Sequence, residues 1–131
     1  METPLSRDKT LPGPSAEPLP DDAVVVRCGR PPFDDPTPLR QRCDWHEGHF
    51  GFSVQCGAGV FLEELSRWCP NRKIGVTTVG AVRVLGYDVI VTSGKGHHAT
   101  VAVSPDWTHE DSRRLVDLFR EQVNPSQRMA R

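Results

Sequence analysis

Four short segments of the chain carry the residue pattern of β-strands. Within residues 49–54 the side chains alternate, so that Phe50 and Phe52 belong to one face and Ser53 to the other. Alternation of this kind, together with β-branched residues, predicts strands over residues 23–28, 49–54, 87–92 and 98–103. The glycine-containing sequence SGKGH joins the last two segments and predicts a hairpin between them.

Three further segments show features of α-helices. Phe61, Leu65 and Trp68 recur at helical spacing, and a threonine followed later by Gly86 is typical of the two ends of a short helix. The predicted helices span residues 58–68, 79–85 and 108–123. Together the two patterns predict an α+β fold, in which a small, mainly antiparallel sheet packs with two or three helices.

The two ends of the chain differ in composition from its middle. Residues 1–22 hold five of the twelve prolines and show no apolar periodicity, a composition that does not repay the entropy of ordering. We therefore expect a flexible, proline-rich tail over residues 1–22, a single domain over residues 23–123 and a frayed end over residues 124–131. Inside the domain, residues 29–47 are rich in proline and charge and predict a long loop.

Composition and charge narrow the classes of function. The formal net charge of −1 provides no broad field for binding nucleic acid, and no apolar run approaches the length needed to cross a bilayer. The N-terminus lacks the apolar stretch of a secretory signal, so we expect a cytoplasmic protein without a membrane anchor. The four cysteines could form two disulfides in an oxidising compartment, but in the cytoplasm we expect them to be reduced and to act as small buried residues.

A cluster of zinc-capable side chains lies between residues 43 and 56. Cys43, His46, His49 and Cys56 occur within fourteen residues, but they lack the paired CxxC spacing of zinc ribbons and fingers. We therefore do not expect a metal site here.

Two other chemical motifs are incomplete. Residues 94–96 (Gly-Lys-Gly) lack the remainder of a phosphate-binding loop, although Lys95 is available to touch an anionic ligand. Ser53, His98 and Asp88 contain the residue types of a hydrolase triad, but no GxSxG sequence surrounds the serine. Neither motif predicts an activity on its own.

Strand alternation brings a different set of polar residues together. In residues 98–103 the alternate apolar side chains face the core, which leaves His98 and Thr100 as neighbours on the other face. Ser53 lies opposite the phenylalanines of its own strand, and Arg27 ends the first strand. A guanidinium suits a phosphate, while a hydroxyl and an imidazole orient a ligand or move a proton. We predict one cleft lined by these four residues; the alternative is that each occupies a solvated strand face.

Three stretches of the sequence resemble a known family. They are Arg27 at a strand end, GFSV at residues 51–54, and IGVTTVGAVRVLGYDVIVTSGKGHHATVAV at residues 74–103. This order is similar to that of small bacterial toxin-like proteins of the ADP-ribosyltransferase type, and the similarity covers roughly residues 23–120.

The resemblance implies that NAD binds in a split sheet. It implies that Arg27 binds the pyrophosphate and Ser53 lies near the nicotinamide ribose, that His98 and Thr100 line the pocket, and that His98 and Ser53 take part in catalysis. The sequence has no Glu-x-Glu element, which many such transferases use. A toxin of this kind implies a cognate immunity or antitoxin partner. The alternative is a non-enzymatic interaction module that is itself such a partner.

Overall fold

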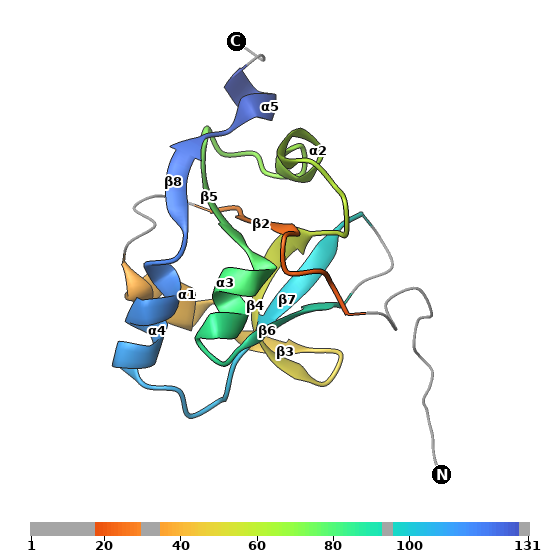
Figure 1. The fold of residues 1–131 in the computed structure, drawn as a ribbon. Helices are drawn as coiled ribbons and strands as arrows, with labels where there is room; N and C mark the ends of the chain where they lie inside the picture. The colour runs from red at the N-terminus through yellow and green to blue at the C-terminus, as the bar shows by residue number, and fades with distance from the viewer. Residues whose placement is uncertain (1–17, 30–34, 93–95, 129–131) are drawn as a thin grey trace.

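An antiparallel sheet of seven strands forms the centre of this computed structural model, which describes residues 18–29, 35–92 and 96–128 (Figure 1). The strands are β2 (Val24–Arg27), β3 (Asp44–His46), β4 (His49–Cys56), β5 (Lys73–Thr78), β6 (Asp88–Val91), β7 (His98–Ala102) and β8 (Arg120–Val123). Their order is β6-β7-β4-β2-β5-β8, and β3 pairs with β4 beside this path.

Strand β4 is shared by the two halves of the sheet. Along one edge it pairs with β7 over residues 51–55. Along the other edge it pairs first with β3, at residues 49–51, and then with β2, at residues 55–56. The sheet is therefore split on this edge, because neither β3 nor β2 pairs with the middle of β4.

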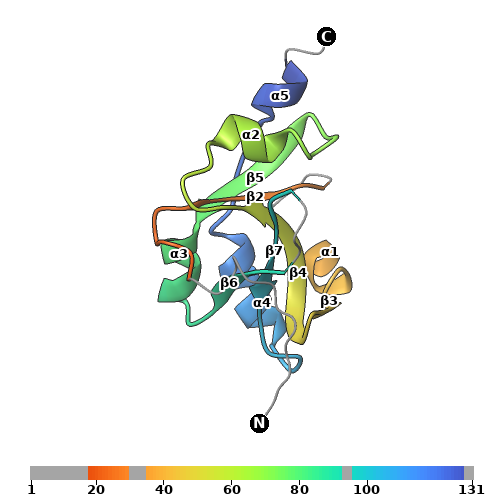
Figure 2. The same ribbon diagram turned by 90° about the vertical axis from the view of Figure 1, so that its right-hand side faces the viewer.

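Helices cover the two faces of the sheet unequally. They are α1 (Pro36–Gln41), α2 (Leu62–Ser66), α3 (Val79–Val84), α4 (His109–Val116) and α5 (Pro125–Arg128). Side chains from α1, α3 and α4 form the main core with alternate residues of β2, β4 and β7. A smaller core lies on the other face, where α2 covers β2 and β5, and α5 lies next to α2 (Figure 2). Every helix in the described ranges is too short or too polar to cross a membrane.

The α+β fold class and the four predicted strands are confirmed. The predicted hairpin between β6 and β7 is also present, although residues 93–95 of its turn lie outside the described ranges. The short helix α3 begins as expected, because the Thr78 side chain accepts a hydrogen bond from the backbone of Ala81. Gly86 follows it with a φ of 95°, a conformation that favours glycine.

Two predicted helices are wrong in extent. The helix expected over residues 58–68 is limited to α2. The helix expected over residues 108–123 ends at Val116, and the chain then turns and pairs with β5 as β8. Val123, which the helical spacing placed on an apolar stripe, is instead exposed on this edge strand. Tertiary pairing thus overrides a local helical pattern.

The expected loop over residues 29–47 contains regular structure. Helix α1 begins after Asp35, whose side chain accepts a hydrogen bond from the backbone of Thr37, and Pro36 occupies its first turn. Strand β3 follows and forms a tight hairpin with β4. The cluster of proline and charge that predicts a loop here instead lies at the start of a helix.

Both ends of the domain extend beyond the predicted boundaries. Leu19 is buried in the main core and Asp21 forms an ion pair with Arg83, so the tail expected over residues 1–22 is wrong for its last part. At the other end Asn124 is fully buried, which contradicts a frayed segment starting there. Its Nδ2 lies within 3.4 Å of the carbonyl oxygens of Ser66, Cys69 and Asn71. Residues 1–17 and 129–131 lie outside the described ranges.

A disulfide joins Cys28 to Cys69, so the expectation that all four cysteines are reduced is wrong. It links the end of β2 to the segment after α2 and forms part of the smaller core. Cys43 and Cys56 are free thiols. Burial raises the pKa of Cys56 to about 12 and that of Cys43 to about 11, so both are inert at neutral pH.

The disulfide is expected to stabilise the fold substantially. Its two cysteines are 41 positions apart, and closing a loop of that size in the unfolded chain corresponds to about 4 kcal/mol. Guanidinium unfolding with and without reductant measures this effect. A Cys28→Ala/Cys69→Ala variant is the control, because reductant should leave its stability unchanged. Equal stability of the native chain in both conditions would contradict the expectation.

Asn124 is expected to hold the C-terminal segment in place. Asn124→Ala removes an amide that contacts three carbonyl oxygens in a buried position, and should lower the free energy of unfolding by about 2 kcal/mol. The matched control is Gln122→Ala, at an exposed position of β8, which should change it by less than about 0.5 kcal/mol. Chemical denaturation compares the two variants, and equal free energies of unfolding would show that the Asn124 side chain does not hold the C-terminal segment.

Candidate functional site

A chain of side-chain hydrogen bonds connects β4, β7 and the end of β6. The Oγ of Ser53 lies 3.0 Å from Nε2 of His98, whose Nδ1 lies 3.0 Å from Oγ1 of Thr92. Oγ1 of Thr92 in turn lies 2.9 Å from Oγ1 of Thr100. Four polar side chains from three segments thus form one continuous line.

The strand register places these residues on one face. Ser53 is paired with Thr100, so their side chains share the face opposite Phe52 and the main core. His98 lies two residues before Thr100 and reaches diagonally to Ser53. The predicted contact between Ser53 and the His98–Thr100 pair is therefore present, on the polar face of the sheet.

The line of hydrogen bonds runs from solvent into the protein interior. Ser53 is exposed and His98 is half-buried, whereas Thr92 and Thr100 are 3% and 0% exposed. A buried hydroxyl must find a partner to offset its lost hydration. The two threonines do so with each other and with His98, and Ser53 is the end of the line that a ligand can reach.

The β3–β4 hairpin lies beside His98. Its turn residues Glu47 and Gly48 both have positive φ, the conformation of a two-residue hairpin turn. The hairpin brings the His46 ring to 5.9 Å from the ring of His98, measured between centroids. Nε2 of His46 is buried and has no hydrogen-bond partner among the described residues.

These surroundings keep His98 neutral. Burial, and then the neighbouring His46, lower the pKa of His98 below its usual value, while the carboxylate of Glu47 acts in the opposite direction. At neutral pH the imidazole therefore carries one proton, on either Nδ1 or Nε2.

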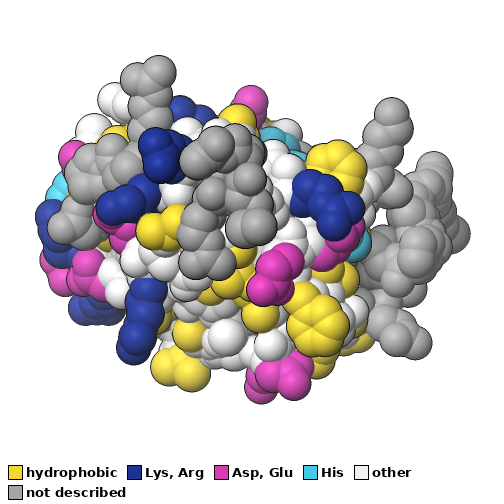
Figure 3. All heavy atoms as spheres, turned by 90° about the horizontal axis from the view of Figure 1, so that it is seen from above, with side chains coloured by type: hydrophobic (Ala, Val, Ile, Leu, Met, Phe, Trp, Pro, Cys, Tyr) yellow, Lys and Arg dark blue, Asp and Glu magenta, His cyan; other side chains and the backbone are white. Residues whose placement is uncertain are grey.

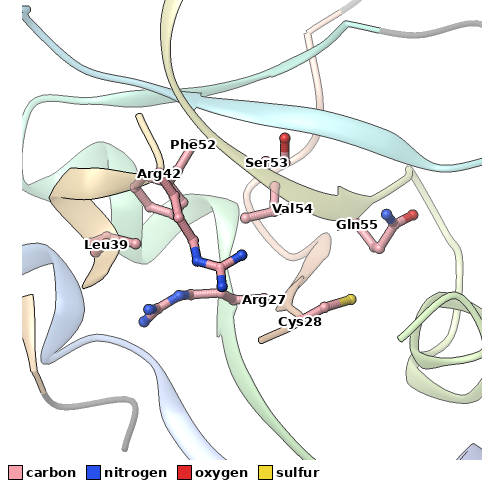
Figure 4. A pocket seen from close by; sticks show the side chains of 8 residues that line it. All are labelled: Arg27, Cys28, Leu39, Arg42, Phe52, Ser53, Val54 and Gln55. Carbon is pink, nitrogen blue, oxygen red and sulfur yellow. The ribbon is translucent and has the colours of Figure 1, made fainter. Parts of the chain in front are cut away.

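The structure does not bring all four residues of the predicted cleft together, because Arg27 and Ser53 line one pocket that His98 and Thr100 do not line. The pairing of Val25 with Cys56 and Val26 with Gln55 places Arg27 across from Val54, on the face of the main core. Figure 4 shows the Ser53 hydroxyl on the side of β4 away from the Arg27 side chain. Arg27 shares a face of β2 with the buried Val25. The register of β2 with β4 therefore places the Arg27 side chain on the opposite face of the sheet from the Ser53 side chain.

Arg27 instead lines a pocket of about 330 Å³ at the split edge of β4 (Figure 4). The pocket is also lined by residues of β4 and the α1 region and by the residue that follows β2, namely Phe52, Ser53, Val54, Gln55, Leu39, Arg42 and Cys28. Burial, and then the nearby charge of Arg42, lower the pKa of Arg27 to about 10. Arg27 therefore stays charged at neutral pH, with the guanidinium of Arg42 close to it (Figure 4).

The incomplete motifs do not assemble. Asp88 forms an ion pair with Arg83 at 3.0 Å and takes no part in the hydrogen-bond line of Ser53 and His98. In the zinc-capable cluster, Cys56 packs in the main core. Across the described ranges no three side chains of the metal-ligating types come together as a metal site. Lys95 lies outside these ranges.

Thr92 and His46 are the members of the site that sequence reasoning missed. Thr92 shares a strand face with Ile90, and Ile90 pairs with Thr100, so the hairpin register would have placed Thr92 next to His98. His46 falls within the loop predicted over residues 29–47, and only the two-residue turn Glu47-Gly48 indicates that it lies across from His49.

Comparisons with known proteins add nothing to these observations, since no family model, curated protein or solved structure matches the chain. The resemblance to the ADP-ribosyltransferase type therefore stays a prediction.

The lowered pKa of His98 predicts a pH-dependent stability. Below the usual histidine pKa of 6.5, the unfolded chain binds a proton that the folded protein resists, so folding becomes less favourable as the pH falls. We expect the melting temperature to fall between pH 7.5 and 5.5, and to fall less in His98→Gln. An NMR titration of His98 giving a pKa above 6.5 would contradict this expectation.

Proposed function

We propose that the protein is an NAD-dependent transferase of the ADP-ribosyltransferase type, with its reacting centre at Ser53 and His98. The observation that carries the proposal is the 3.0 Å contact between these two side chains, which lie 45 positions apart in the sequence. Its exposed end is available to a ligand, and buried threonines fix its inner end. Such a supported polar pair is typical of a site that orients a bound molecule.

The chemistry of NAD suits these two side chains. The nicotinamide ribose carries hydroxyl groups and the nicotinamide carries a carboxamide, which a serine hydroxyl and a neutral imidazole bind through hydrogen bonds. In the transfer, the bond between ribose C1′ and the nicotinamide nitrogen breaks, and its electron pair leaves with neutral nicotinamide. A nucleophile of the target bonds to C1′ and loses its proton to solvent. Ser53 and His98 would hold the ribose and the carboxamide in place for this exchange.

The other residues of the predicted site take different roles in this proposal. Thr100 is fully buried and acts through Thr92, without touching the ligand. Arg27 lies beyond β4 and would not bind the same part of NAD as Ser53. Glu47, whose charge acts on His98, is the carboxylate that we assign to this face in place of the missing Glu-x-Glu element.

A second candidate is a non-enzymatic interaction module, such as an immunity or antitoxin-like partner. The observation that favours it is the exposure of two aromatic side chains at the ends of α2, Phe61 at 78% and Trp68 at 53%. Viewed from the end of the molecule with α2 and α5, hydrophobic side chains are exposed among charged ones (Figure 3). Exposed aromatic residues of this kind are enriched at protein interfaces.

An assay for nicotinamide release from NAD, combined with calorimetric binding of NAD, tests the first candidate. Ser53→Ala and His98→Ala should each lower NAD binding by about tenfold and release by about a hundredfold. His109→Ala is the control, since His109 is an exposed residue at the start of α4, and it should leave both measurements unchanged.

Circular dichroism should show the same fold in all three variants. A wild-type protein that neither binds NAD nor releases nicotinamide would refute the transferase and leave the interaction module as the remaining candidate. Equal losses in His109→Ala would show that the effects are not specific to the site.

A further inference from the structure

The hydrogen-bond line of Ser53, His98, Thr92 and Thr100 has two self-consistent directions of donation. Each hydroxyl supplies one proton, and a neutral imidazole supplies one proton from either of its nitrogens. In the outward direction, Thr100 donates to Thr92, Thr92 donates to Nδ1 of His98, and Nε2–H donates to Ser53. In the inward direction, Ser53 donates to Nε2, Nδ1–H donates to Thr92, and Thr92 donates to Thr100.

Burial of Thr100 distinguishes the two directions. Among the described residues, its hydroxyl has Thr92 as its one side-chain partner, at 2.9 Å, and the residue is 0% exposed. In the inward direction the proton of Thr100 has no acceptor, and leaving a buried donor unsatisfied is costly. In the outward direction every buried proton has an acceptor, and the remaining proton belongs to the exposed Ser53, where water or a ligand accepts it.

We propose that Thr100 and Thr92 hold His98 as the Nε2–H tautomer, so that the site presents a polarised Ser53 hydroxyl as a hydrogen-bond donor. His98 donates to the Ser53 oxygen, and this donation strengthens the Ser53 O–H as a donor toward the ligand. The group that fits is an acceptor oxygen, such as the carbonyl of a carboxamide or a phosphoryl oxygen. Thr92 is a positioning residue, since it acts on the ligand only through His98.

The tautomer also decides between two chemistries for Ser53. A serine becomes a nucleophile when a neighbouring imidazole nitrogen accepts its proton. In the outward direction Nε2 already carries a proton and does not accept one, so Ser53 binds the ligand and does not attack it. This deepens the proposed function and rests on it for the identity of the ligand, whereas the tautomer itself is a property of the free protein.

Long-range ¹H–¹⁵N NMR correlation of the full chain at pH 7.5 tests the tautomer directly. The His98 signals are assigned by their absence in His98→Gln. We expect the Nε2–H pattern, with a population about tenfold above that of Nδ1–H. Thr92→Val removes the donor to Nδ1 and should shift the population toward Nδ1–H. Thr100→Val should keep the Nε2–H pattern, because the buried Thr92 hydroxyl then has Nδ1 of His98 as its one acceptor among the described residues.

Thr92→Ser keeps the hydroxyl and is the matched control, which should retain the wild-type pattern. An Nδ1–H pattern in the wild type, or an unchanged pattern in Thr92→Val, would overturn the assignment. A fluorophosphonate probe, which labels activated serines, gives a second test. We expect no labelling of Ser53. Labelling of the wild type that is lost in Ser53→Ala would show an activated serine and contradict the proposal. If NAD fails to bind while the Nε2–H pattern is observed, the proposed function is wrong and the tautomer assignment stands.

Discussion

The alternation of β4 between two environments is the constraint on which the rest of the structure depends. Phe52 and Val54 enter the main core while Ser53, between them, points to the polar face. A shift of its pairing by one residue would exchange these faces and bury Ser53 while exposing the two apolar side chains. The cost of that exchange fixes the register with β7, and the register in turn brings His98 to Ser53.

Local patterns predicted the strands and the contact between Ser53 and His98, and they failed where distant partners decide the structure. Alternation within one strand depends only on neighbouring residues, so the polar faces of β4 and β7 were readable. The side of the sheet that Arg27 occupies depends on the pairing of β2 with β4, which no local pattern encodes. Residues 120–123 fit a helical stripe but gain more from pairing with β5, and the partner of Cys28 is likewise decided by the fold.

The side chains on the two faces of β4 differ in electrostatic character. On one side the neutral His98 and its hydroxyl partners form a line of hydrogen bonds without formal charge. On the other side the pocket of Arg27 and Arg42 concentrates positive charge in partly buried surroundings. A ligand of the polar face would be selected by hydrogen-bond geometry, whereas a ligand of the arginine pocket would be selected by charge. One strand keeps these two modes of recognition apart.

The disulfide between Cys28 and Cys69 has a consequence for how the chain can travel. The bond closes a covalent ring that contains α1, β3, β4 and α2. An extended polypeptide can thread a narrow pore end first, but a ring of this size presents two or more strands side by side at the constriction. Translocation by threading would therefore require the thiol form, with oxidation following on the far side in a compartment that favours it. Once formed again, the disulfide would prevent the chain from threading back through the same pore.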